Sequence, residues 1–385
     1  MRILIIPTSD WLSHPIPSRL HFIFERLADR HEIHVIRYPI PLWNVRRNSK
    51  AFVHEAASFP IRDLSLYYVI NAPNHLLLLD NILKSNKIDA IVFANILTGV
   101  ESIIFGKKHR IPLVCDYLDH FPESASSYYT NPFAKTLVEA AVANITKWNL
   151  NKANYVVTVS KCFLNWLKEV GIRNTTLIPN GVDLQEFTSA DRDDARERIG
   201  IRELEGKFVV TYTGSVESWY DLDMVARATQ ILNRLGVPTV FQVVGGHLVN
   251  RDNNRSIGFQ RNVVQTGFVD NKSVSSHINA SDVCVLPLKK MAKNLTRPLK
   301  LLEYFSCGKP VFMLPNSELE LEFGDAITVY HNADELAKIL LESARNPDKF
   351  LHKIEKGYRY AQMNSWDNHA TSYEKLLKRI VDSNA

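Results

Sequence analysis

The chain has 385 residues, of which 45% are hydrophobic and 23% are charged. This is the composition of a globular protein with a large core, and the length indicates two domains of the usual size, about 100–200 residues each. The formal net charge of +5 comes entirely from residues 1–185, which carry 20 Lys and Arg against 15 Asp and Glu. This bias favours contact with phosphates or with an anionic membrane surface, although scattered solvated lysines explain it equally well.

Cysteine usage and the N-terminal sequence bear on the compartment. The four cysteines show neither a CxxC pair nor a zinc-binding spacing, so we expect buried, reduced thiols. The apolar run at residues 3–6 is too short for a signal peptide and is typical of a buried strand. No run of about 18 apolar residues is present, so no membrane-spanning helix is expected. We expect a cytoplasmic protein and leave its association with a membrane open.

Short apolar runs alternate with amphipathic stretches along the whole chain. The first half has expected strands at residues 3–6, 33–36, 90–94, 112–115 and 155–159, with helices at 18–29, 99–108 and 132–152. The second half has expected strands at residues 208–212, 239–244, 283–286 and 311–314, with helices at 222–235, 272–280, 298–306 and 333–344. Strands that alternate with helices in this way predict parallel sheets covered on both faces.

The two sets of elements predict two Rossmann-like domains of the α/β class. Pro, Asn, Gly and Asp cluster between apolar segments at residues 179–189, so the domain boundary is expected there. We assign residues 1–180 to the first domain, 181–362 to the second, and 363–385 to a C-terminal helix that braces the first domain. Open parallel sheets bind ligands at the carboxyl ends of their strands, which predicts a site in a cleft between the domains.

Several short motifs follow one another in a fixed order over residues 155–315. They are Val159-Ser160, Pro179 to Asp183, Tyr212 to Ser215, Val243 to Gly246, Gly267 to Val269, Ala280 to Val283 and Arg297 to Val311. This ordered set resembles the retaining GT-B glycosyltransferases of family four (glycosyl transferases group 1). The resemblance implies a nucleotide diphosphate sugar as donor substrate on the second domain and a glycan or lipid-linked acceptor on the first. It also implies front-face substitution assisted by the leaving diphosphate, with no cofactor and no nucleic-acid partner.

The segment Arg297–Pro310 carries the clearest donor chemistry. Pro298 suits the first turn of a helix, and Lys300 then lies near the helix N-terminus, where backbone N–H groups favour an anion. Glu303 follows one turn later and can accept hydrogen bonds from a ribose. The resemblance gives the same roles, Lys300 for the diphosphate and Glu303 for the ribose. The alternative is an ordinary surface ion pair between residues three apart.

Further donor-binding positions follow from the resemblance. Glycines after two strands let backbone approach a phosphate, although ordinary strand-to-helix turns explain them as well. The complete expected set, besides Lys300 and Glu303, is Gly214, Ser215, Gly245, Gly246, Phe268, Val269, Arg297, Pro298 and Leu299.

The chain also departs from the common family pattern. Ser215 and Trp219-Tyr220 stand where most members have an Arg and a Lys, and Leu295 stands where the first of two glutamates is usual. The loop Gly214–Asp223 instead resembles a sub-branch with a GxxxxWxDxD pattern, in which Arg297 and Lys300 supply the charge for the diphosphate. Asp221-Leu222-Asp223 imitates a metal-binding DxD motif, but it begins a helix, so we interpret it as an N-terminal cap and predict no metal site.

In the first domain, Asp119 and His120 follow an expected strand end and are the candidates to position or deprotonate an acceptor hydroxyl. A helix cap and a surface histidine are the alternative. Ser18 and Arg19 open an earlier helix and are candidates to touch phosphate or acceptor.

Trp43 with Arg46 and Arg47 suits an acceptor or an anionic membrane surface, but a plain solvent loop suits the same residues.

Two other functions remain compatible with these motifs. A sugar-nucleotide epimerase can share the two-domain fold, and a catalytically silent nucleotide-binding partner subunit would explain the missing cations and glutamate.

Overall fold

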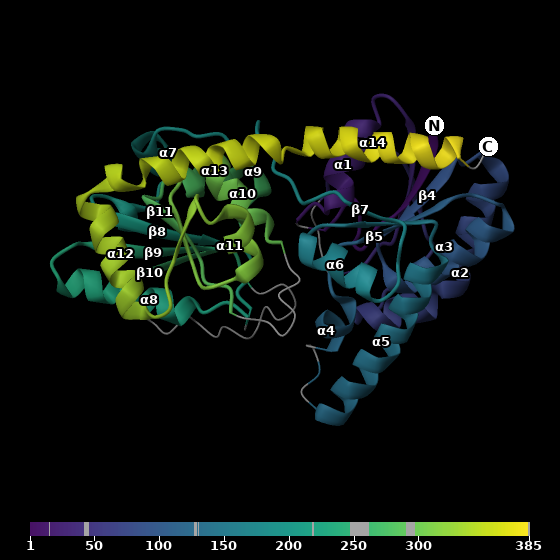
Figure 1. The fold of residues 1–385 in the computed structure, drawn as a ribbon, viewed down its shortest axis with the longest axis horizontal. Helices are drawn as coiled ribbons and strands as arrows, with labels where there is room; N and C mark the ends of the chain where they lie inside the picture. Colours follow the sequence, from purple (N-terminus) through teal and green to yellow (C-terminus); the bar gives the residue numbers. More distant parts are fainter. Residues whose placement is uncertain are drawn as a thin grey trace. The chain divides into compact units, whose positions relative to one another are not determined.

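The computed structural model describes residues 1–14, 16–41, 46–126, 129, 131–217, 219–246, 262–289 and 297–383. It divides into two compact units (Figure 1). The first unit comprises Met1–Asn180, Leu295–Arg297 and Trp366–Ala385. The second comprises Gly181–Asn294 and Pro298–Ser365. Each unit has its own sheet and its own hydrophobic core.

The first unit is built on a seven-stranded parallel sheet with the order β3-β2-β1-β4-β5-β6-β7. Its strands are β1 (Arg2–Ile6), β2 (Glu32–Arg37), β3 (Phe52–Glu55), β4 (Ala90–Phe93), β5 (Leu113–Tyr117), β6 (Tyr155–Thr158) and β7 (Thr175–Leu177). The central strands β1, β4 and β5 are buried along nearly their whole length, as expected of a sheet covered on both faces.

The helices of the first unit cover this sheet in two layers. They are α1 (Arg19–Leu27), α2 (Leu64–Ser85), α3 (Ile96–Lys108), α4 (Phe121–Ser126), α5 (Pro132–Lys152), α6 (Lys161–Glu169) and α14 (Trp366–Asp382). The C-terminal helix α14 packs on α1, where Trp366 stacks on Phe22 with ring centroids 5.1 Å apart. Because parallel crossovers are right-handed, α2, α3, α5 and α6 lie on the face opposite α1.

The second unit has a six-stranded parallel sheet with the order β10-β9-β8-β11-β12-β13. Its strands are β8 (Phe208–Thr213), β9 (Thr239–Val244), β10 (Val263–Gly267), β11 (Val283–Leu286), β12 (Val311–Met313) and β13 (Ile327–Val329). Its α-helices are α7 (Arg192–Ile199), α8 (Leu222–Arg234), α9 (Asn271–Asn279), α10 (Leu299–Ser306), α11 (Ser317–Phe323), α12 (Ala333–Arg345) and α13 (Leu351–Met363).

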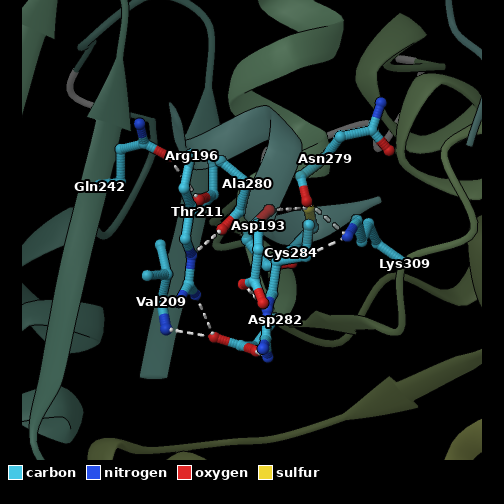
Figure 2. A network of polar contacts seen from close by, with 12 residues as sticks. Asp193, Arg196, Val209, Thr211, Gln242, Asn279, Ala280, Asp282, Cys284 and Lys309 are labelled. Atoms are coloured by element: carbon cyan, nitrogen blue, oxygen red, sulfur yellow. Dashed lines mark hydrogen bonds and ion pairs between the residues drawn. The ribbon is translucent and has the colours of Figure 1, made fainter. Parts of the chain in front are cut away.

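Two of the motifs in the second unit hold helices onto the sheet. The Asp282 carboxylate accepts from the Val209 N–H at 2.7 Å and pairs with Arg196 at 2.8 Å, which ties α7 to the start of β8 (Figure 2). Lys309 donates to the carbonyl oxygens of Asn279 and Ser281 at 2.8 and 2.9 Å, at the C-terminal end of α9. A cation on the last carbonyls of a helix complements its dipole. These two side chains therefore stabilise the fold near the starts of β8, β11 and β12.

The elements predicted from the sequence are present, with ends that shift by a few residues. The prediction missed strands β3, β7, β10 and β13 and helices that include α2 and α13. Helix α2 has apolar residues nearly all round and contains Pro73, so it lacks the 3.6-residue period by which helices are recognised. Among the helices in the described ranges, none has the length and apolar character needed to cross a membrane.

Candidate functional site

The candidate site begins with the two loops that follow β8 and β9. Gly214 and Gly245 come directly after these strands and have φ angles of +123° and +128°, in a region that side chains rarely adopt. The Gly214 N–H donates to the Val244 carbonyl at 2.8 Å. A Cβ atom on Gly245 would collide with the Gly214 carbonyl group. The backbones of the two loops therefore pack directly on one another at the carboxyl edge of the sheet.

The Lys300 ammonium lies against this pair of loops. Lys300 is in the first turn of α10, whose N-cap is Pro298. Its Nζ donates to the Tyr212 hydroxyl at 2.9 Å and lies 4.1 Å from the ring centroid of Tyr212 and 4.2 Å from that of Tyr220. A Cβ on Gly214 would collide with the same Nζ. We call the arrangement of Lys300 between Tyr212 and Tyr220, against Gly214, the lysine cage.

The hydrogen bonds of the lysine cage run in one direction, from Lys300 through Tyr212 to the backbone of Ser215. The Tyr212 hydroxyl accepts from Lys300 and donates to the Ser215 carbonyl at 2.6 Å. Burial raises the pKa of Tyr220 to about 12, so this ring stays neutral around Lys300 at pH 7. Two neutral rings stabilise an ammonium through their faces without neutralising its charge. Among the described residues, the hydrogen-bond partner of Lys300 Nζ is thus a neutral hydroxyl and not a carboxylate.

The pKa values of Lys300 and Glu303 are both shifted from their ordinary values. Burial lowers the pKa of Lys300 to about 7, and the nearby Glu303 opposes this shift. Burial likewise raises the pKa of Glu303 to about 7, against the effect of Lys300 and with a further contribution from Glu186. Both side chains are half-buried, and no ion pair joins them. The alternative of an ordinary surface ion pair is therefore wrong for these two described residues.

Other predicted donor residues surround the cage. Phe268 is half-exposed, and its ring lies 3.2 Å from the place that a Cβ on Gly246 would take. Gly245 donates to the Gly267 carbonyl at 2.9 Å, which brings Val269 to the same edge of the sheet. Pro298 and Leu299 begin α10 beside Lys300. The structure thus brings together Gly214, Ser215, Gly245, Gly246, Phe268, Pro298, Leu299 and Lys300 at the ends of β8, β9 and β10 and at the start of α10.

Three further positions are Arg297 of the donor prediction, the Leu295 position and Asp221. Arg297 is buried and belongs to the first unit, where its carbonyl accepts from the Asn180 side chain at 2.8 Å. Leu295 lies outside the described residues. The side chain of Asp221 accepts from the Met224 N–H at 3.1 Å and caps α8, as the capping interpretation predicts.

In the first unit, the end of β5 holds a buried polar cluster. Asp116 forms an ion pair with Arg19 at 3.1 Å and accepts from the Tyr373 hydroxyl at 3.0 Å. Arg19 also donates to the Ile178 carbonyl at 2.9 Å and is buried. Ser18 caps α1. Ser18 and Arg19 therefore both help to fix α1, and their contact with phosphate or acceptor stays a prediction.

Asp119 and His120 follow this cluster. Asp119 accepts from the backbone N–H of His120 at 2.8 Å. His120 is buried, with Nδ1 3.3 Å from the Tyr117 hydroxyl and its ring edge-on to Trp166 at 5.5 Å. The alternative of a surface histidine is wrong. The position of both residues just beyond the carboxyl end of β5 keeps them as candidates for acceptor chemistry.

The proposed membrane or acceptor loop is only partly described. Trp43 lies outside the described residues. Arg46 is exposed, and the Arg47 N–H donates to the Leu12 carbonyl at 3.0 Å.

The residues that the sequence did not indicate are Tyr212, Tyr220 and Glu186. The Glu186 carboxylate accepts from Asn271 at 2.7 Å, and burial raises its pKa. The sequence held one signal for Tyr220: Trp219-Tyr220 stands where most family members have a Lys, which raised the question of what takes the place of that cation. The replacement is an aromatic ring rather than a charge.

The fold and the sequence of the two units match known proteins. The structure resembles the sucrose-phosphate synthase of Thermosynechococcus elongatus with a TM-score of 0.76 over 99% of both chains, at 15% identity, which confirms the GT-B fold. Residues 19–186 match the model of Glycosyltransferase Family 4, and residues 207–346 match that of Glycosyl transferases group 1.

Two curated relatives extend over most of the chain. A Bacillus subtilis glycosyltransferase assigned to teichuronic acid biosynthesis is 24% identical over 80% of this chain and 79% of the relative. An Escherichia coli UDP-Gal:alpha-D-GlcNAc-diphosphoundecaprenol alpha-1,3-galactosyltransferase is 25% identical over 83% of this chain and 81% of the relative. The chain is therefore a two-domain glycosyltransferase of the GT-B fold. It joins a family 4 glycosyltransferase domain to a group 1 glycosyltransferase domain.

Proposed function

We propose that this enzyme transfers a sugar from a nucleoside diphosphate sugar to a glycan or lipid-linked acceptor, with retention of the anomeric configuration. The observation that carries the proposal is the lysine cage. Lys300 Nζ lies against the backbone of Gly214, at the carboxyl end of β8 and at the N-terminus of α10. An ammonium, a helix N-terminus and a side-chain-free loop at one point suit a diphosphate.

The other residues take roles around this point. Glu303, one turn along α10, accepts from the ribose hydroxyls once its carboxyl group is ionised. Phe268 and Val269 flank the base. In the transfer step, the acceptor oxygen bonds to the anomeric carbon while the bond from that carbon to the diphosphate oxygen breaks. The electron pair goes to the diphosphate, and the charge of Lys300 stabilises it there. The step requires neither a metal ion nor a carboxylate nucleophile.

Acceptor chemistry belongs to the first unit in this proposal. Asp119 and His120 lie beyond β5, and the contact between His120 and Tyr117 orients the imidazole. His120 then positions the acceptor hydroxyl, and its proton leaves to the imidazole or to the departing diphosphate. Support for a lipid-linked acceptor comes from the Escherichia coli relative, whose name specifies a diphosphoundecaprenol substrate and a UDP sugar.

The test is incubation with a panel of nucleotide sugars, with UDP sugars first. Slow release of free nucleotide, followed by transfer to a diphosphate lipid acceptor, supports the proposal, and proton NMR of the product reports the anomeric configuration. A new sugar isomer without nucleotide release indicates an epimerase instead. Binding without turnover on any acceptor indicates a silent partner subunit. The matches to glycosyltransferase models and relatives do not favour these two alternatives.

A further inference from the structure

The outer layer of the first unit exposes an unusual number of large apolar side chains. It is formed by α2, α3 and α5, with α3 packed against both of the others. Helix α5 begins beyond the body of the unit (Figure 1), with Phe133 80% and Leu137 61% exposed. A helix on the surface of a globular protein normally presents charged residues to water. In this layer the exposed lysines gather near the C-terminal ends, and Lys135 in the first turn of α5 is the exception.

The exposed apolar residues form stripes along the helices. On α5, Phe133, Leu137 and Trp148 share one side, because they are separated by four and eleven residues. On α2, the exposed residues recur at the same kind of spacing: Leu66, Val69, Ile70, Pro73 and Leu77. The whole segment from Leu64 to Leu79 contains no charged residue. Ile104 is exposed on α3, between the two stripes.

Exposed lysines lie at one edge of the layer, at the ends of these apolar stripes. The three helices all run antiparallel to the strands of the parallel sheet, so their C-terminal ends lie at the same edge of the layer. Each of the three ends there in exposed lysine, namely Lys84 on α2, Lys107 and Lys108 on α3, and Lys147 and Lys152 on α5. The acidic residues of these helices are fewer, and one of them, Glu101, is buried.

We propose that this outer layer of α2, α3 and α5 is a membrane-binding surface that docks on an anionic lipid bilayer. Apolar stripes enter the boundary between headgroups and acyl chains, Trp148 suits the interface, and the lysines contact anionic headgroups. An isologous dimer through the same face would place two layers that each carry more lysines than acidic residues against one another, whereas anionic lipid complements the lysines. The membrane-binding surface is inferred from the exposed residues themselves. Only its purpose, which is to bring the enzyme to a lipid-linked acceptor, rests on the proposed function.

The test is flotation of the full chain with vesicles of phosphatidylethanolamine and phosphatidylglycerol at three to one. We expect binding that weakens on phosphatidylcholine vesicles and at high salt, because the lysine contribution is electrostatic. The double variant F133Q/L137Q should reduce the bound fraction at least tenfold. The matched control is L321Q/M363Q on the second unit, where Leu321 is 81% and Met363 61% exposed, and it should bind like the parent.

Three outcomes would overturn the inference. The first is an absence of binding to either vesicle by the parent chain. The second is an equal loss in both double variants. The third is a dimer in sedimentation velocity that F133Q/L137Q dissociates while vesicles stay unbound, which would identify the face as a protein interface. Donor binding measured on the same preparations separates this result from the proposed function, because the lysine cage lies in the other unit. Circular dichroism and thermal unfolding of all variants confirm that they are folded.

Discussion

The depressed pKa of Lys300 has a direct consequence for donor binding. With a pKa of about 7 in the free protein, Lys300 is roughly ten parts neutral to one part charged at pH 8. A diphosphate on the Gly214 loop favours the charged form and raises the pKa of Lys300 in the complex. Binding at pH 8 should therefore take up close to one proton. The affinity should fall about tenfold per pH unit above 7, until the pKa of the complex is reached.

Glu303 affects the proton exchange on donor binding in the opposite sense, and it does so below pH 7. Its pKa is also about 7, and only the ionised carboxylate accepts hydrogen bonds from ribose on both oxygens. Below pH 7, binding should therefore release a proton from Glu303, while at pH 8 this carboxylate is already ionised and contributes little. The net proton exchange on binding is expected to change from release to uptake as the pH rises through 7.

Calorimetric titration in two buffers of different ionisation enthalpy measures this exchange. The ligand should be the nucleotide sugar that the protein binds in the panel, because its diphosphate does not titrate in this range. Lys300→Arg keeps the charge at all pH values and should abolish the uptake at pH 8. Glu303→Gln should abolish the release below pH 7. Zero proton uptake at pH 8, with constant affinity between pH 7 and 8.5, would refute the reasoning.

Four further predictions concern the second unit. Gly214→Ala should weaken donor binding at least tenfold because its Cβ displaces Lys300, whereas Gly236→Ala, at a positive φ of +82° with open space around it, should lose only stability. Tyr220→Leu should weaken donor binding several-fold at pH 8 through the lost cation–π contact, and Tyr220→Phe should not. Asp282→Ala should lower the free energy of unfolding by about 2 kcal/mol in urea titration and leave the donor affinity of the folded protein unchanged. EDTA should leave nucleotide release unchanged, and a loss that magnesium restores would contradict the metal-free step.

The sequence was sufficient to predict the architecture and most of the second sheet. Thr239–Val244 and Val283–Leu286 are mostly apolar runs flanked by turn residues, and they are strands at those bounds. The helix that holds Lys300 was predicted from Pro298 and the apolar period that follows it, and it differs from the prediction only in that Pro298 is the N-cap. These features depend on local pattern, which a single sequence contains.

The features that were missed depend on contacts between distant residues. Tyr212 and Lys300 are 88 residues apart, and only the packing of α10 against the end of β8 makes the cage. Arg19 pairs with Asp116, which also accepts from the Tyr373 hydroxyl, and the sequence could not show this cluster because its members are 97 and 257 residues apart. Helix α2 was missed because an apolar run without a period does not distinguish a helix from loop or strand.

The central claim is that the lysine cage binds the diphosphate of the donor. The most direct measurement is calorimetric titration of the donor nucleotide into Lys300→Ala, with Lys272→Ala at the start of α9 as a control in the same unit. The account predicts at least tenfold weaker binding by Lys300→Ala and parental affinity for Lys272→Ala. An unchanged affinity in folded Lys300→Ala would contradict it.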